Sequence, residues 1–325
     1  MIEIDVSAAN EFRTCPMMYF NKRVADGTGL ELKQSGYEKV TPLDFGSRMH
    51  ELWEEYYNEL RGNIILPYPE SLNEALEQEA QIMFAAYQAK YPVEVIVSAE
   101  QNDPFEIVDV ERTFRIELPI YCQSCYSKLP KPEDITEGYY CNSCHEHTPG
   151  VPHIGVGKID VVFREEDGKI SIMDHKTENP KGWSNHPKIW AAKDQASFYL
   201  WVAKLIYPGE EIGRFYVNVA KRQSEKGQVG PVFLDRQPLE RTNEQLEISV
   251  RDLVIEADNI DRYKAIFKNG LWPSNKQACT KGTWGDCEFY MPCTYGWSEE
   301  IRQHKYQPRK EYDYLKLGGV PIIQP

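Results

Sequence analysis

Long apolar runs are missing from the sequence, and no stretch approaches the ~20 residues that a membrane-spanning helix needs. Residues 1–10 also lack the charged and then apolar layout of a signal peptide. Both absences argue against a membrane-embedded or secreted protein. We therefore expect a cytoplasmic protein with no membrane partner.

Basic residues are scarce as well. Lys and Arg number 37 against 50 Asp and Glu, which gives a formal net charge of −13. Proteins that hold duplex nucleic acid tightly and without sequence preference are usually basic, because they neutralise phosphates. The charge argues against a protein of that class. Any contact with nucleic acid must rely on a local channel or on a partner protein.

Cysteine is too scarce for a secreted disulfide scaffold, with eight among 325 residues. Four of them, Cys122, Cys125, Cys141 and Cys144, form two C-x2-C pairs that are fifteen residues apart. Four thiolates at this spacing are typical of zinc ribbons, in which they hold one Zn²⁺ tetrahedrally. We predict an inserted zinc-ribbon module of about 30 residues that is too small to fold without its metal.

The remaining cysteines are Cys15, near the start of the chain, and Cys279, Cys287 and Cys293 near its end. An isolated cysteine such as Cys15 is most often a small buried hydrophobe. Because the zinc-ribbon pattern uses the other four, the remaining set also numbers four. This parity favours a second metal centre, with C-x7-C-x5-C as its C-terminal part.

What the sequence does contain is a hairpin that carries acids. Residues 159–163 and 169–174 are β-branched, apolar runs joined by a turn that contains Gly168. Asp160 lies on the first run, and Asp174 and Lys176 close the second, with the same side-chain direction because strands alternate with period 2. Two converging carboxylates suit a hard cation such as Mg²⁺ or Mn²⁺. A D-x-K triplet alone is more often a surface ion pair.

Three further segments add candidate residues. Residues 44–60 form an amphipathic helical pattern with His50 at the border of its apolar stripe, a place where a core histidine is the usual finding. The strand pattern near 112–118 begins beside Glu111, and Glu100 competes with it as a further acid. A helix predicted over 189–207 presents Gln195 and Tyr199 on one face, although Tyr199 would also fit a core.

Taken in order, Asp160, Asp174-His175-Lys176-Thr177 and Gln195-x-x-x-Tyr199 resemble the motifs of the PD-(D/E)xK nuclease superfamily. They are more narrowly similar to its RecB-like group and the related CRISPR-adaptation exonucleases. The resemblance implies a site in which Asp160, Asp174 and the His175 carbonyl bind Mg²⁺ or Mn²⁺. It further implies that Lys176 serves the attacking water, and that Gln195 and Tyr199 face the nucleic acid.

The same resemblance extends to residues outside the central motifs. His50, in a G-x-x-x-H pattern, matches a metal-contacting histidine, and Glu111 matches an additional acid. A Cys-Pro in the first helix matches the first ligand of a 4Fe–4S cluster, which implies Cys15, Cys279, Cys287 and Cys293 as its ligands. The gap of seven residues after Cys279 is longer than the usual two of the family, so zinc competes with the cluster.

The expected fold is α/β: a PD-(D/E)xK restriction-endonuclease-like core with a mixed central sheet flanked by helices. Its strands are predicted near 112–118, 157–163, 169–174 and 214–220. Along the chain we predict N-terminal helices and first core strands, the zinc ribbon, the catalytic core, the cysteine segment that closes on Cys15, and a basic and aromatic tail. These segments span residues 1–120, 121–150, 151–270, 271–295 and 296–325.

The function that the resemblance implies is a metal-dependent deoxyribonuclease, an exonuclease in recombination, repair or phage replication that acts on DNA single strands or ends. Its partner would be a helicase or a recombination protein, and its host a bacterium, with a phage gene as one source. The alternatives are a non-cleaving DNA- or partner-binding protein on the same scaffold, and an iron–sulfur redox protein. The tail is read either as a single-strand stacking surface or as a disordered, partner-binding segment.

Overall fold

The computed structural model describes eleven stretches of the chain, to which all structural statements here refer: residues 1–33, 42–63, 67–68, 73–91, 105–130, 138–148, 150–178, 192–221, 233–279, 287–309 and 320–324. The chain forms two compact units. Unit 1 comprises Met1–Tyr37, Phe114–Gly157 and Glu247–Pro325, and unit 2 comprises Glu38–Thr113 and Lys158–Leu246. The five segments predicted along the sequence stay a prediction.

Unit 2 is built on a mixed sheet with the strand order β3, β6, β7, β8, β9. These strands are β3 (Phe105–Glu117), β6 (Ile154–Glu165), β7 (Ile170–Glu178), β8 (Ile212–Lys221) and β9 (Phe233–Leu239). The predicted hairpin is confirmed, because β6 and β7 pair antiparallel, and Gly168 in their turn has a φ of 82°. β8 is parallel to β7, and β9 is antiparallel to β8.

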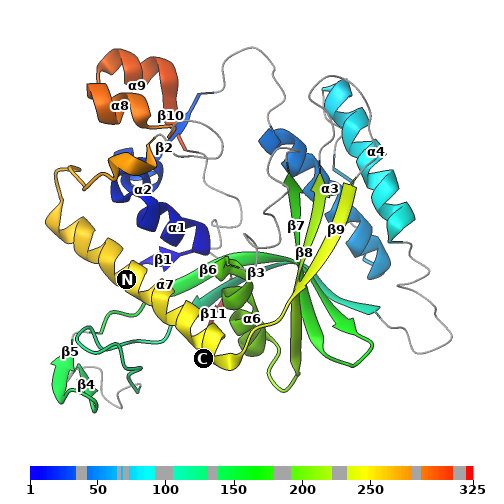
Figure 1. The fold of residues 1–325 in the computed structure, drawn as a ribbon, viewed down its shortest axis with the longest axis horizontal. Coiled ribbons are helices and arrows are strands. Elements are labelled where there is room, and N and C mark those ends of the chain that lie inside the picture. Colours follow the sequence, from blue (N-terminus) through cyan, green and yellow to red (C-terminus); the bar gives the residue numbers. More distant parts are fainter. Residues whose placement is uncertain are drawn as a thin grey trace. The chain divides into compact units, whose positions relative to one another are not determined.

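Three helices cover the sheet of unit 2: α3 (Pro42–Leu60), α4 (Glu74–Lys90) and α6 (Asp194–Ile206). α3 and α4 lie side by side (Figure 1). The predicted apolar stripe of α3 is buried in one core with α4 and the inward side of β6 and β7, and its members are Phe45, Met49, Leu52, Trp53 and Tyr56. The first residues of the helix predicted over 189–207 lie outside the described residues.

Unit 1 contains the remaining elements: β1 (Glu3–Ile4), α1 (Val6–Thr14), α2 (Pro16–Arg23), η1 (Ala25–Gly27), β2 (Leu30–Leu32), β4 (Tyr139–Cys141), β5 (Glu146–Thr148), most of α7 (Asn243–Ile266), η5 (Lys276–Ala278), α8 (Tyr290–Tyr295), α9 (Glu299–Lys305), β10 (Tyr306–Pro308) and β11 (Ile322–Ile323). β1 pairs parallel with β6 at residues 154–155, and β11 pairs parallel with β3 at residues 115–116. β4 and β5 form a small hairpin.

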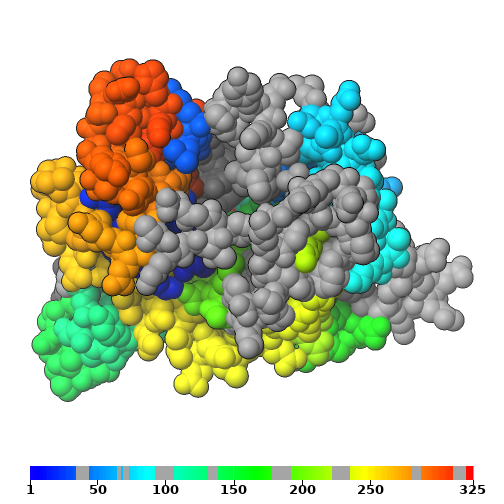
Figure 2. All heavy atoms as spheres, turned by 45° about the horizontal axis from the view of Figure 1, so that its top comes forward, coloured from blue at the N-terminus to red at the C-terminus, as the bar shows by residue number. Residues whose placement is uncertain are grey.

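The first part of the predicted tail is folded rather than free. β10 pairs antiparallel with β2, and the orange surface of α8 and α9 lies against the blue surface of β2 (Figure 2). Tyr306 is 3% exposed, stacks on Phe289 and donates to the Glu288 carbonyl oxygen at 2.6 Å. Tyr306 belongs to the predicted basic and aromatic tail, and the interpretation of that tail as a stacking surface for single strands is wrong for this residue, because its ring is buried. Residues 310–319, with Lys310, Tyr312 and Tyr314, lie outside the described residues.

None of the described helices is both long enough and apolar enough to cross a bilayer.

An aromatic cluster around Trp272 joins the beginning of unit 1 to its end. The indole of Trp272 is 3% exposed and stacks on Tyr19 at 5.9 Å. Phe12, Phe20 and Tyr263 lie within 6.3 Å of it, between ring centroids. Each such ring removes a large apolar area from water. The cluster fixes α1 and α2 beside the segment that leads to Cys279.

Replacing this indole should destabilise unit 1. We expect Trp272→Ala to lower the free energy of unfolding by about 3–5 kcal/mol, because it leaves a cavity in a packed aromatic core. The matched control is Leu271→Ala at the neighbouring position, where the side chain is 70% exposed, and it should change little. Urea denaturation followed by circular dichroism measures both. Equal effects of the two substitutions would contradict the role of the cluster.

Candidate functional site

The hairpin brings the two aspartates of unit 2 to the same end of the sheet. Val161 and Met173 are register partners, and Asp160 and Asp174 are the residues that come next on each strand. Paired residues on antiparallel strands share a face. Both side chains are buried, with Asp160 7% and Asp174 2% exposed. Buried carboxylates must be met by cations or by N–H donors.

Three ligand-type side chains, one of them Asp160, converge from three elements. His50 of α3, Glu111 of β3 and Asp160 of β6 place one ligand atom each within 4.8 Å of one another. His50 Nδ1 lies 3.7 Å from Asp160 Oδ2. The sequence left Glu111 and Glu100 as rival candidates. Glu111 joins this group, whereas Glu100 lies outside the described residues. These three donors could hold a divalent cation.

The backbone at Glu111 is unusual for a strand. Its φ is +52°, in the left-handed region of backbone conformation that residues other than glycine rarely adopt. Such a conformation costs about 1 kcal/mol and persists where its surroundings impose it, often at functional sites. The sequence suggested that Glu111 opens the strand, but β3 begins six residues earlier, at Phe105.

Lys158 is a site residue that the sequence analysis missed. Its Nζ forms an ion pair with the Glu111 carboxylate. Lys158 precedes Asp160 by two positions on β6, so both side chains leave the strand in the same direction. The K-x-D spacing mirrors Asp174-x-Lys176 on the neighbouring strand, and this symmetry is the signal that could have identified it.

Asp174 has its own partners. Lys176 Nζ lies 2.6 Å from Asp174 Oδ2, and Gln195 Nε2 of α6 donates to Asp174 Oδ1 at 3.0 Å. Tyr199, one turn after Gln195, packs its ring edge-on against Phe215 of β8 with centroids 6.3 Å apart. The structure therefore brings Gln195 to the acids, while Tyr199 lies against the sheet.

The two aspartates differ in pKa. Burial raises the pKa of Asp174 to about 6, although the Lys176 ammonium opposes the change. Burial also acts to raise the pKa of Asp160, but His50, Lys176 and the His175 N–H outweigh it and hold this pKa below its ordinary value. Burial lowers the pKa of His50, so its imidazole is held neutral, the form that binds metals. The carboxylates and the neutral imidazole are therefore in forms that can bind a cation.

His175 contributes its main chain to the site. Its N–H donates to Asp160 Oδ2 at 2.7 Å, and its backbone also hydrogen bonds with the His50 ring. Its side chain points to the other face of the sheet, because it alternates with Asp174 and Lys176. There it stacks on Trp53 of α3 with centroids 4.4 Å apart.

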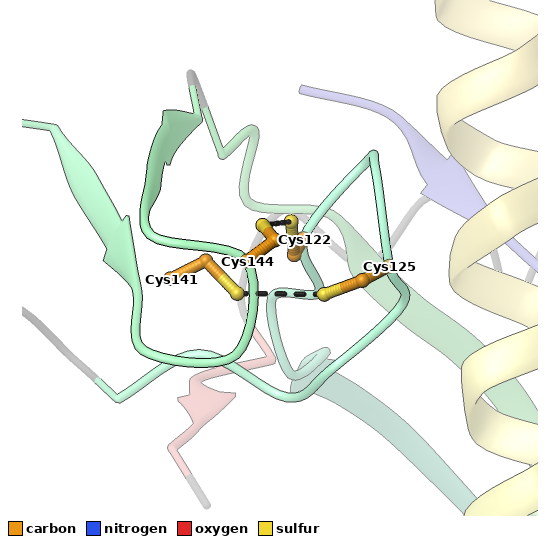
Figure 3. A group of neighbouring side chains, drawn as sticks. All are labelled: Cys122, Cys125, Cys141 and Cys144. Atoms are coloured by element: carbon orange, nitrogen blue, oxygen red, sulfur yellow. Dashed lines mark hydrogen bonds between the residues drawn. The ribbon is translucent and has the colours of Figure 1, made fainter.

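In unit 1 the zinc-ribbon cysteines meet as predicted. The sulfurs of Cys122 and Cys144 are 3.5 Å apart, those of Cys125 and Cys141 are 3.4 Å apart, and the four Sγ atoms lie within 4.8 Å of one another (Figure 3). Four thiolates around one Zn²⁺ would be about 3.8 Å apart, given a Zn–S bond of about 2.3 Å. The segment is closed at its base, where the Leu118 N–H donates to the His153 carbonyl oxygen at 2.9 Å.

The thiols of this group differ in acidity. Hydrogen bonds with Ser127 lower the pKa of Cys125 to about 6, whereas burial raises the pKa of Cys144 to about 12. A cation at the centre of the group would hold all four as thiolates. This donor set can bind Zn²⁺ or an iron–sulfur centre.

The first cysteine of the second set, Cys15, is buried between α1 and α2. Cys15 Sγ accepts from the Asn275 N–H at 3.3 Å, and Met17 N–H donates to the Pro273 carbonyl oxygen at 2.9 Å. The Cys287 N–H in turn donates to the Cys279 carbonyl oxygen at 2.9 Å. The first cysteine of the set therefore lies beside the segment that carries the other three.

These four thiols also influence one another. Burial raises the pKa of Cys293 to about 11, and the neighbouring Cys287, Cys15 and Cys279 add to the increase. In the described parts of the chain their sulfurs do not all lie within 4.8 Å of one another, in contrast to the ribbon group. The four thiols are therefore neighbours, but they do not form a ligand group as compact as that of the ribbon cysteines.

One known family covers nearly the whole chain. A family model described as the PD-(D/E)XK nuclease superfamily matches residues 3–294. Among solved structures, one titled "Crystal structure of SSO0001" is similar over 69% of this chain and 78% of its own, with 12% identity and a TM-score of 0.24. That score is too low to bear on fold or function. No curated protein matches the sequence.

The backbone at Glu111 gives a test of the site's geometry. We expect Glu111→Gly to be more stable than Glu111→Ala by about 1 kcal/mol, because both lose the carboxylate and only glycine adopts a positive φ without cost. Thermal unfolding of the two variants measures the difference.

The adjacent Arg112 provides the matched control, since it is not among the residues with positive φ. There the order should reverse, with alanine more stable than glycine. A Glu111→Ala variant as stable as Glu111→Gly would contradict the left-handed conformation.

Proposed function

Because the chain belongs to the PD-(D/E)XK nuclease superfamily, we propose that it is a Mg²⁺- or Mn²⁺-dependent deoxyribonuclease. It hydrolyses phosphodiester bonds from DNA ends as an exonuclease in recombination, repair or phage replication. Its DNA substrate is single-stranded or offers a free end, and a helicase or recombination protein is its expected partner.

The observation that carries this proposal is the convergence of His50, Glu111 and Asp160, from three elements, within 4.8 Å of one another. A site that only stabilised the fold would have little reason to gather two carboxylates at a buried sheet end, because their desolvation is costly. Asp174 and Lys176 complete the acid–acid–lysine set that the family motif requires. The donor set of oxygens and one imidazole suits Mn²⁺ and Mg²⁺.

Each residue has a task in the proposed reaction. Asp160, Asp174, His50, Glu111 and the His175 carbonyl would hold the cation, which when bound supplies a more acidic water and stabilises charge on the phosphate. The Lys176 ammonium, held by Asp174, would orient the attacking water. Gln195 fixes the Asp174 carboxylate. Gln195 and Tyr199 of α6 are proposed to position the DNA strand.

The two cysteine sets are proposed as structural metal centres. Cys122, Cys125, Cys141 and Cys144 would bind Zn²⁺, which their sulfur spacing supports. Cys15, Cys279, Cys287 and Cys293 would bind a 4Fe–4S cluster that joins the beginning of unit 1 to its end. The hydrogen bond from Asn275 to the Cys15 sulfur supports the closure.

Cleavage should depend on Asp160. We expect Asp160→Asn to lower Mn²⁺-dependent digestion of end-labelled DNA on the order of 10³-fold, because it removes a charged ligand and leaves the shape intact. The control is Asp167→Asn, which changes an exposed acid in the turn of the same hairpin.

Single- and double-stranded substrates should be compared, with labels at either end, so that end-dependent digestion is separated from internal cuts. Wild-type cleavage retained in Asp160→Asn would overturn the site. DNA binding by the wild-type protein without any cleavage would favour the non-cleaving alternative.

The metal content should separate the two cysteine sets. Protein purified without oxygen is expected to contain zinc and to be brown, with broad visible absorbance from an iron–sulfur cluster. Cys141→Ser should lower zinc and keep the colour, whereas Cys287→Ser should remove the colour and keep zinc. Colourless wild-type protein with zinc in both centres would refute the iron–sulfur assignment.

A further inference from the structure

A row of polar side chains crosses three strands of unit 2 on the face opposite the acids. His175 of β7 is the register partner of Asn218 on β8, and Asn218 is the register partner of Arg236 on β9. His175 and Asn218 are each 1% exposed. Polar groups at such depth are costly unless they are hydrogen bonded to one another.

Hydrogen bonds join the row from one strand to the next. Asn218 Nδ2 lies 2.6 Å from His175 Nδ1 and 3.2 Å from the Tyr87 hydroxyl. Arg236 Nε lies 3.4 Å from Asn218 Oδ1, and its Nη2 donates to the Tyr87 hydroxyl at 3.1 Å. Because the guanidinium only donates, it directs the amide oxygen of Asn218 toward itself and the amide N–H groups toward His175.

This orientation determines the tautomer of His175. An amide that donates to Nδ1 requires that nitrogen to be an acceptor, so the proton of the neutral imidazole lies on Nε2. Nε2 is buried and has no hydrogen-bond partner among the described residues. Its ring is held instead by stacking, on Trp53 at 4.4 Å and on Tyr57 at 5.5 Å.

The row also has an outer anchor. The Arg236 guanidinium lies 3.9 Å from the ring centroid of Tyr91, which caps α4. The charge is thus held over an aromatic face at the edge strand of the sheet, where cation–π attraction adds to its hydrogen bonds.

While the His175 side chain is held by this row, its main chain contacts the acid site. Its N–H orients the Asp160 carboxylate, and its backbone meets His50. We propose that Asn218 and Arg236 are positioning residues that, by fixing the His175 side chain, hold its main chain in register for metal binding. This inference rests on the proposed function and deepens it, because neither residue belongs to the family motif or touches the acids.

The test is direct binding of Mn²⁺ by calorimetry, without DNA. We expect Asn218→Leu, which keeps the shape and removes the amide, to raise the Kd for Mn²⁺ about tenfold or more. Asn218→Asp should restore affinity to within about threefold, because a carboxylate can accept from a protonated His175 Nδ1 and face Arg236. Arg236→Met should raise the Kd about threefold, and Arg236→Lys less.

Arg214→Met is the matched control for Arg236→Met. Arg214 lies on β8, the strand that carries Asn218, but its guanidinium pairs with Glu165 and Glu240, so its replacement should leave the Kd unchanged. Nitrogen NMR of histidine-labelled protein reports which ring nitrogen of His175 carries the proton. This property would not change if Asn218 had only a packing role. Wild-type His175 should be unprotonated at Nδ1, and the Asn218→Asp variant protonated there.

The outcomes decide the inference separately from the nuclease proposal. A folded Asn218→Leu protein with wild-type Mn²⁺ affinity would overturn it, as would a wild-type His175 that carries its proton on Nδ1. If Asn218→Leu does not fold, unchanged affinity in Arg236→Met overturns the inference instead. Wild-type protein that binds Mn²⁺ but cuts no DNA would refute the proposed function while the variants still decide the positioning role. Absence of Mn²⁺ binding would refute both.

Discussion

The burial of two carboxylates at one end of the β6–β7 hairpin is the constraint on which the arrangement of unit 2 depends. Asp160 and Asp174 are nearly inaccessible to solvent, and each must be compensated. The compensation comes from separate elements: the His175 N–H and His50 beside Asp160, and Lys176 and Gln195 beside Asp174. Each donor requires its own helix or strand to be in place, so the site and the fold of unit 2 form together.

These partners do not fully offset the cost of burying the acids, and the remaining cost favours binding of a cation. The pKa of Asp174 is raised to about 6 by burial, and the imidazole of His50 is held neutral by the same cause. Glu111 adds a third acid at the cost of a strained backbone and an ion pair with Lys158. A divalent ion would relieve several of these costs at once, which is the physical basis of the proposed metal dependence.

In unit 1, the main contacts join segments that are far apart in the sequence. The aromatic cluster around Trp272 and the hydrogen bonds of Asn275 bring residues 272–279 to α1 and α2. The ribbon segment, by contrast, is closed locally by Leu118 and His153 and by its four sulfurs. Metal centres suit both tasks, because a single ion or cluster can join segments that have little apolar surface to bury.

Several features could be predicted from the sequence because their causes are local. The hairpin follows from alternating apolar runs and Gly168, the buried stripe of α3 from helical spacing, and the ribbon from two C-x2-C pairs. The acid–acid–lysine motif was likewise readable, since period 2 alone sets the direction of Asp174 and Lys176. β9 was missed because it contains Asp235, Arg236 and Pro238, which are atypical of strands, and the two-residue β1 and β11 are too short to show any period.

The tertiary structure decided what depends on the pairing of distant strands. Glu111 meets His50 and Asp160 only because β3 and β6 have the observed register and α3 lies beside them. A shift of either strand by one residue would turn its acid to the other face of the sheet. Only folding reveals that Tyr306 is core, that Lys158 meets Glu111, and that Asn218 and Arg236 support His175 from strands far along the chain. The sequence by itself determined which chemical groups are available and which local elements carry them. Their convergence was decided by long-range packing, because no local periodicity encodes which strands become neighbours.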